Sequence, residues 1–299
     1  MLKGLAITPP VVGRISIGRV IERNGKRLPE KDDQFTLTSQ IQNREGWILH
    51  PLDEGLRQAA GGKLRSLPVR LMFNDPRLNL RADYSLFDRA TGRPMCVGNG
   101  ESCRRATQEG IAMLPCPGPT GCAYAAGDCK AYARLNVLVG EAEEDALGSF
   151  VLRTTSFNTI RTLAARMQYY SAVSGGLLAC MSLELKLRGK STTMSHRAAI
   201  YYVDLVVRSG RTLEQAVADA RELDAQRRAA GIDQEALDEA ARRGFSNGAF
   251  EELEEDVPAV VEEFYPQSGP ADVGVPRTEE AVSSLRARLE SKVARAAAG

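Results

Sequence analysis

Residues 148–170 read GSFVLRTTSFNTIRTLAARMQYY, and the character of the chain changes midway through this stretch. Its first part, residues 148–155, is typical of a β-strand. Ser156 then stands where a helix N-cap belongs. Behind it, apolar side chains recur at the spacing of one helix face, at Ile160, Leu163, Ala164, Met167 and Tyr170. The stretch predicts a strand that leads directly into an amphipathic helix.

Further strands are predicted on both sides of this unit. Residues 14–21 and 34–38 form a hairpin pattern, with the turn pair Asn24-Gly25 at the start of the connection. Other strand-like stretches follow at 67–73, 80–87, 133–140, 178–188 and 198–208. We expect an α+β fold with an antiparallel, β-rich core over residues 1–210. An OB-like barrel is one form that this core can take.

The remaining chain is predicted to be helical and acidic. Residues 211–250 form a helical extension, in which Leu213, Ala216, Val217, Ala220 and Leu223 keep helical spacing. Residues 251–276 form an acidic and Pro-bearing linker. Residues 277–299 form a C-terminal amphipathic helix, striped by Val282, Leu285, Leu289 and Val293.

Charge divides the 299 residues into a basic body and an acidic tail. The formal net charge is +1, but residues 1–210 sum to +9 and residues 211–299 sum to −8. No signal peptide is recognisable at the N-terminus. The longest uncharged apolar stretch, residues 174–183, is shorter than the roughly 20 residues that cross a bilayer. We therefore expect a cytoplasmic protein with no membrane partner.

Five of the six cysteines fall within one Gly- and Pro-rich segment, residues 95–130. They are Cys96, Cys103, Cys116, Cys122 and Cys129. Since no signal peptide points to an oxidising compartment, metal binding is favoured over disulfides, and zinc is the metal that tetrahedral thiolates suit best. An iron–sulfur cluster and free or redox-active thiols are the alternatives. Cys103 is the spare or alternative ligand, because its charged surroundings predict a helix while the later cysteines lie in turns.

A basic, hydroxyl-rich block suggests contact with nucleic acid. Hydroxyls, an amide and guanidinium groups all donate to phosphate oxygens. They are found where the strand meets the helix and in the turn after residue 185: Arg153, Thr154, Thr155, Ser156, Asn158, Arg161, Lys186, Arg188 and Lys190. The competing interpretation is that Ser156 only caps the helix and that Arg153 pairs with a neighbouring carboxylate.

The order of these motifs resembles the recombination directionality factor-like family of phages and integrative elements. The resemblance rests on the strand that begins at Gly13, the Cys96/Gly98/Gly100 group, the Cys116/Cys122/Cys129 series and the block 150–161. Some relatives carry the label "hydrolase or metal-binding protein". The resemblance implies zinc held by Cys96, Cys116, Cys122 and Cys129. It also implies a role in directing a serine integrase, or another recombination protein, by binding.

We therefore expect a zinc-binding, non-enzymatic accessory protein of a phage or mobile element that binds an integrase, DNA, or both. The first alternative is a single-stranded-DNA-binding protein with an OB-like fold. A metal-dependent hydrolase is less favoured, because the dense ligand cluster is all sulfur and the chain holds only two histidines, His50 and His196. The sequence does not predict the oligomeric state.

Overall fold

The computed structural model describes residues 9–23, 26–43, 46–140, 148–191, 199–244, 260–261 and 264–265, without side chains at 19–31 and 46. All of these residues belong to one compact unit, residues 1–266. The predicted linker, 251–276, lies outside the described residues except for these last four positions. The predicted C-terminal helix, 277–299, lies outside them entirely.

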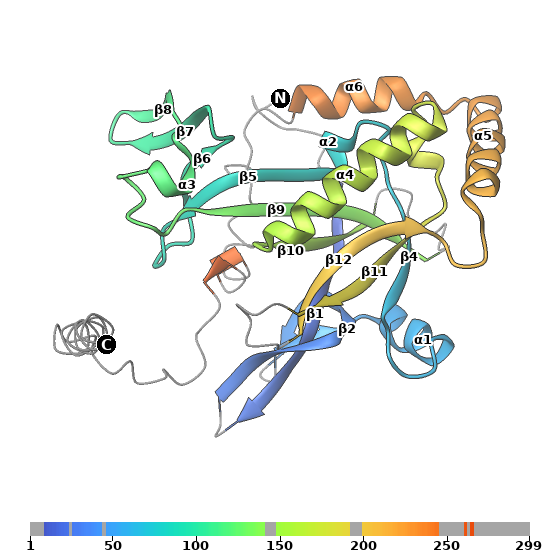
Figure 1. Ribbon diagram of the computed structural model, residues 1–299, viewed down its shortest axis with the longest axis horizontal. Helices are drawn as coiled ribbons and strands as arrows, with labels where there is room; N and C mark the ends of the chain where they lie inside the picture. The colour runs from blue at the N-terminus through green and yellow to red at the C-terminus, as the bar shows by residue number, and fades with distance from the viewer. Residues whose placement is uncertain are drawn as a thin grey trace, which may run out of the picture. The chain divides into compact units, whose positions relative to one another are not determined.

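Nine strands form one continuous path of hydrogen-bonded neighbours (Figure 1). Strand β1 runs parallel to β10, and every other neighbouring pair on the path is antiparallel. The α+β, mostly antiparallel prediction is confirmed, whereas the OB-like barrel is not. The order along the path is β3 (Gly46–Leu49), β2 (Lys26–Asn43), β1 (Val11–Arg23), β10 (Ser149–Thr154), β9 (Lys130–Val139), β5 (Leu80–Phe87), β6 (Pro94–Gly98), β7 (Ser102–Thr107) and β8 (Gly110–Pro115).

Three more strands lie off this path and close the main core. They are β4 (Ser66–Arg70), β11 (Leu183–Lys190) and β12 (Ile200–Val207), and β4 joins them to β9. Side chains alternate between the two faces of a strand. Leu183 and Leu185 of β11 therefore point with Val203 and Leu205 of β12 into the core, where all four are fully buried.

Helix α4 (Phe157–Ser174) covers this core as the sequence predicts. The Ser156 hydroxyl accepts a hydrogen bond from the Thr159 amide at 3.4 Å, which satisfies one of the free donors of the first turn. Leu163 and Met167 are fully buried. On the same helix, Arg166 donates to the buried Asp204 of β12 at 3.0 Å and so ties α4 to that strand.

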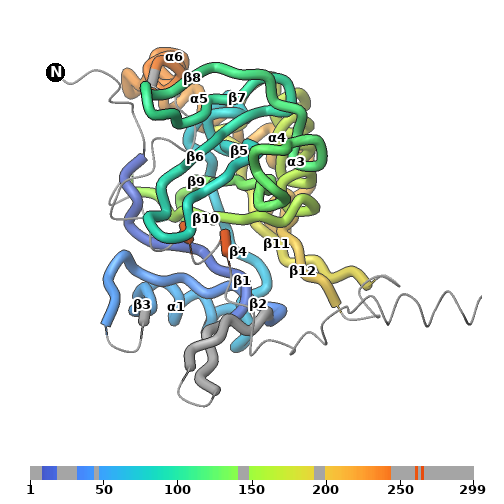
Figure 2. The backbone as a smooth tube through the Cα atoms, turned by 90° about the vertical axis from the view of Figure 1, so that its left-hand side faces the viewer, coloured from blue at the N-terminus to red at the C-terminus, as the bar shows by residue number. Residues whose placement is uncertain are grey.

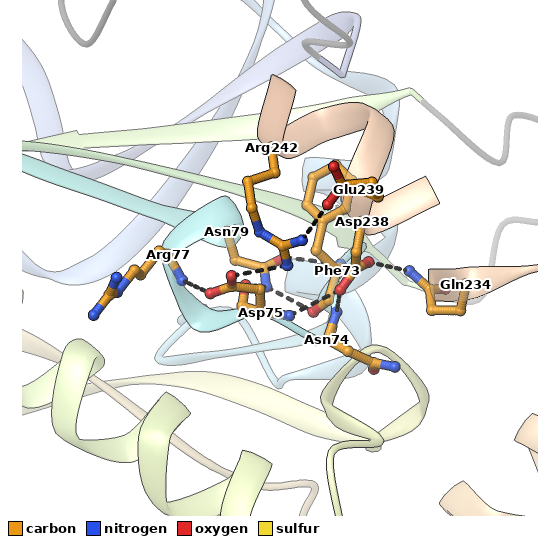
Figure 3. A network of polar contacts seen from close by, with 9 residues as sticks. All are labelled: Phe73, Asn74, Asp75, Arg77, Asn79, Gln234, Asp238, Glu239 and Arg242. Carbon is orange, nitrogen blue, oxygen red and sulfur yellow. Dashed lines mark hydrogen bonds and ion pairs between the residues drawn. The ribbon is translucent and has the colours of Figure 1, made fainter. Parts of the chain in front are cut away.

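The helical extension consists of α5 (Leu213–Ala229) and α6 (Gln234–Gly244). Ala216 and Ala220 of α5 are fully buried in the main core. Helix α6 is held by Asp238, whose buried carboxylate accepts from the amides of Asn74 and Asp75 at 3.0 Å each and from the Gln234 side chain (Figure 3). Those amides open the short helix α2 (Pro76–Asn79), so α6 is attached through the start of another helix. The other helices are α1 (Pro51–Ala59) and α3 (Gly118–Gly121).

Two predictions of local structure are wrong. The stretch around Cys103 is not helical but forms β7, because Ser102–Thr107 pairs with β6 on one side and β8 on the other. The expected strand at 178–188 begins only at Leu183, because Leu178–Cys180 forms a 3-10 turn buried in the core. At β7, strand pairing overrides the local preference for a helix.

Candidate functional site

The cysteine-rich segment forms the outer end of the long sheet. We call residues 94–129 the cysteine module. Figure 2 shows its strands β6, β7 and β8 as neighbours beside β5, and Figure 1 shows the module and α5 at opposite ends of the long strands. The module therefore contains more regular structure than its Gly- and Pro-rich sequence suggests. It consists of the three consecutive strands β6, β7 and β8, followed by the short helix α3.

All five clustered cysteines line one small cavity. Its volume is about 10 Å³, which is the space of roughly one water-sized sphere. No histidine or carboxylate side chain belongs to its lining, which is otherwise aromatic, small or aliphatic apart from Arg105. The cavity therefore offers a compact, all-sulfur donor set. The sixth cysteine, Cys180, is buried in the main core instead.

Gly98 allows the thiols to approach each other. A Cβ atom on this residue would lie 2.6 Å from the Cβ of Cys103 and 2.9 Å from the Sγ of Cys116. Both distances are too short for any side chain. The glycine is required here by close packing, because strands β6 and β7 meet the Cys116 loop at this point.

The thiols lower one another's acidity. Burial raises the pKa of Cys129 to about 11, and the neighbouring Cys122, Cys96 and Cys116 contribute in the same direction. Burial also raises the pKa of Cys103 to about 11, with a further contribution from its hydrogen bond to Cys96. Several negative charges in so small a space repel each other. A stable thiolate cluster at this place needs a cation.

Arg105 of β7 is a neighbour of the cluster that the sequence does not single out. Burial alone would lower its pKa, but the Cys96, Cys103 and Cys122 thiols outweigh that effect and raise the pKa. Its guanidinium carbon lies 3.9 Å from the centre of the Tyr124 ring, a cation–π distance. Only the alternation along β7 could have revealed this placement, because it puts Cys103 and Arg105 on the same face.

The chemistry of this donor set fits a structural zinc ion. Four thiolates complete a tetrahedral zinc shell. Among the residues that the structure describes, however, no group of three or more His, Cys, Asp or Glu side chains has the spacing of a finished metal site. The thiols converge on the cavity, and holding an ion there requires them to close around it.

Cys103 differs from the other four cysteines of the cluster. Its thiol donates to the carbonyl of Pro115 at 3.7 Å. Its side chain is almost completely buried on β7. Cys103 nevertheless lines the same cavity as the other four, and the helix that the sequence predicts for it is absent.

Most of the predicted nucleic-acid block gathers around the start of α4 and strand β11. Lys190 donates to the side-chain oxygen of Asn158 at 2.8 Å, which brings the two parts of the block together. Several other members hold internal contacts: the Thr154 hydroxyl accepts from the Ser156 amide, Lys186 pairs with Glu184, and Arg188 pairs with Asp204. Thr155 is half-buried, and Arg161 is exposed on α4.

Arg153 lies apart from this group. Its neighbour Leu152 points into the main core, so Arg153 points to the opposite face of the sheet, where it is 7% exposed. There it stands directly opposite Arg134, which in turn stands opposite Arg81. Three adjacent strands thus carry one row of arginines across this second face. The sequence does not predict this row, because it does not show which residues of neighbouring strands pair with each other.

Comparison with known proteins gives one match. A model of the family described as recombination directionality factor-like matches residues 12–208. The matched range begins in β1 and ends just after β12, so it includes nearly the whole sheet and the cysteine module. No curated protein and no solved structure matches the chain. In the described part of the chain, no helix is long and apolar enough to span a membrane.

Proposed function

This chain belongs to the recombination directionality factor-like family, and from that premise we propose that it is a zinc-stabilised, non-enzymatic accessory protein of DNA recombination. It acts by binding an integrase, DNA, or both. The family match over residues 12–208 is the observation that carries the proposal. The arrangement of the cysteine module supports the zinc component.

Zinc is proposed to bind Cys96, Cys116, Cys122 and Cys129. The shared cavity, the absence of other donor types from its lining and the need for a cation among crowded thiols all support this set. A zinc ion with four thiolate ligands has no open position for water. Its role is then to hold the strands and turns of the module in place.

A binding role is also supported by a surface depression of about 1110 Å³, lined by α5, α6 and the turn that follows α4. Charged side chains that line it pair with each other: Arg228 with Asp224, and Arg242 and Arg243 with Glu239. These groups have the character of a solvated helical surface.

Direct DNA contact is assigned to the start of α4, where Arg161 is exposed and Lys190 lies beside Asn158. Contacts to phosphates from such groups are independent of sequence and weaken as salt rises. We expect weak binding by the isolated protein. An integrase partner strengthens retention on DNA, and a difference of only about 1–3 kcal/mol between two assemblies redirects the outcome.

The test is retention of the full chain on attachment-site DNA with and without the integrase encoded on the same element. The proposal expects clear retention only with the integrase. Arg161→Ala should weaken the residual DNA binding, while Arg77→Ala, a change at an exposed arginine on α2, serves as the matched control. Saturation of single-stranded DNA at nanomolar protein, without preference for integrase-bound sites, would favour a single-strand-binding protein instead.

A further inference from the structure

A short segment near the end of the described chain packs onto the second face of the sheet. We call it the docked segment; its described residues are Val260, Val261, Phe264 and Tyr265. The Tyr265 amide donates to the Val261 carbonyl at 2.8 Å, which is the spacing of a helical turn. Val260 and Phe264 are four residues apart and both are fully buried. They are thus two anchors on one side of that turn.

The surface beneath these anchors is formed by Phe87 of β5, Val97 of β6 and Tyr132 of β9. The ring of Phe264 lies 4.8 Å from that of Phe87 and 6.0 Å from that of Tyr132, in both cases edge to face. Such arrangements are favourable beyond the area they bury. Together these three residues form the apolar surface that we call the aromatic groove.

Lys130 and Arg89 stand at the rim of the aromatic groove, and Arg89 also pairs with Asp128 at 3.0 Å. Lys130 donates to the Phe264 carbonyl at 3.0 Å, and Arg89 lies 4.5 Å from the centre of the Tyr265 ring. The Tyr265 hydroxyl donates to the Phe87 carbonyl at 2.7 Å. The sheet thus contacts the backbone of the docked segment and its tyrosine ring, in addition to its two apolar anchors.

The sequence of the docked segment complements this rim in charge. Glu262 and Glu263 separate its two anchors, and Glu254, Glu255 and Asp256 precede it. An acidic sequence with an aliphatic and an aromatic anchor at i and i+4 is the pattern by which an amphipathic helix fills a groove. The groove is therefore specific for a recognisable type of peptide.

We propose that the aromatic groove is a docking site for an acidic helical segment of a protein partner, and that the chain's own docked segment occupies it as an internal competitor. This proposal goes beyond the proposed function and requires neither zinc nor an integrase. Because the competitor is tethered, its effective concentration is high, on the order of millimolar. A partner gains access only when it outcompetes or displaces the docked segment.

The test uses a fluorescent peptide with the sequence of residues 256–267 and the full chain. The peptide should bind the wild type weakly. It should bind the double variant Val260→Ala/Phe264→Ala at least tenfold more tightly, because that variant leaves the groove open. A peptide that carries Phe264→Ala is the matched control and should not bind.

A second variant examines the groove itself. Adding Lys130→Glu to the double variant should weaken peptide binding about tenfold, since it reverses the charge of a half-buried side chain at the rim. Equal binding to the wild type and the open variant, or binding unaffected by Lys130→Glu, would overturn the proposal. So would a gain in affinity for a single-stranded oligonucleotide without a gain for the peptide. Loss of cooperative unfolding in the double variant would also overturn it, because the segment would then be part of the fold and not a removable occupant.

Discussion

The main core and the cysteine module of this protein are held together in different ways. In the main core, the sheet and α4 bury large side chains such as Phe35, Leu37 and Leu163 completely. In the module, the only buried hydrophobic residues are Val97, Cys103 and Ala125, while Ile111 and Met113 are largely exposed. Apolar burial stabilises a fold in proportion to area. The module buries little apolar area, and the proposed zinc ion would compensate for this.

The largest expected effect comes from removing a zinc ligand. Cys116→Ser or Cys129→Ser should release the metal, whose binding contributes on the order of 10–16 kcal/mol of coupled folding free energy. The module should open while the main core stays folded. Limited trypsin digestion checks this, because Arg104 and Arg105 are cleavage sites inside the module.

Cys103→Ser is the matched control for these substitutions. It should leave metal content and protease resistance intact, because its thiol is directed at the Pro115 carbonyl. If Cys103→Ser lost the metal and Cys116→Ser kept it, the assignment of ligands would be wrong.

A substitution in the main core should lower the stability of the fold but leave the zinc content unchanged. Leu163→Ala removes a fully buried side chain and should lower the free energy of unfolding by about 2–5 kcal/mol. Denaturant titration measures this loss, and zinc content should not change. Tyr169→Ala on the same helix is the control, with an expected change within about 0.5 kcal/mol, because that ring is half exposed. Loss of metal in Leu163→Ala would show that the two regions are not independently held.

A smaller effect is expected at the attachment of α6. Asp238→Ala leaves the Asn74 and Asp75 amides without their acceptor, at a cost of about 1–3 kcal/mol. Hydrogen exchange should accelerate in α6 but not in the cysteine module. Glu239→Ala, which removes exposed ion pairs to Arg242 and Arg243, should change exchange far less. Equal acceleration in both variants would contradict the role of Asp238.

The smallest expected effect is at the start of α4. Ser156→Ala removes the N-cap and should cost about 1 kcal/mol of stability. DNA affinity should fall with Arg161→Ala and stay unchanged with Ser156→Ala. Thermal unfolding and a salt-dependent binding assay separate the two roles. A loss of DNA affinity in Ser156→Ala would mean that the hydroxyl contacts phosphate as well.

The sequence predicts best where one local signal decides the structure. Ser156 and the apolar face behind it predict α4, and the stretch 80–87 coincides with β5. The strands of the module are harder to recognise, because β7 reads SCRRAT and has no apolar alternation. Its strand character comes from pairing with β6 and β8.

Contacts between distant residues could not be predicted either. The parallel pairing of β1 with β10 joins positions such as Ile15 and Leu152, and no local pattern encodes it. The arginine row on the second face depends on the registers of three strands. Val260 and Phe264 stand in an acidic stretch that predicts a linker, yet their partners lie more than a hundred residues earlier in the chain. The grouping of the five thiols, by contrast, follows from their closeness in sequence.

Elemental analysis of the purified, reduced and folded protein tests the central claim most directly. The claim is that a metal compensates for the small apolar core of the cysteine module. The account predicts one zinc ion per chain, retained through gel filtration and lost together with the protease resistance of residues 94–129 when a chelator is added. A folded, protease-resistant module that contains no metal would contradict it.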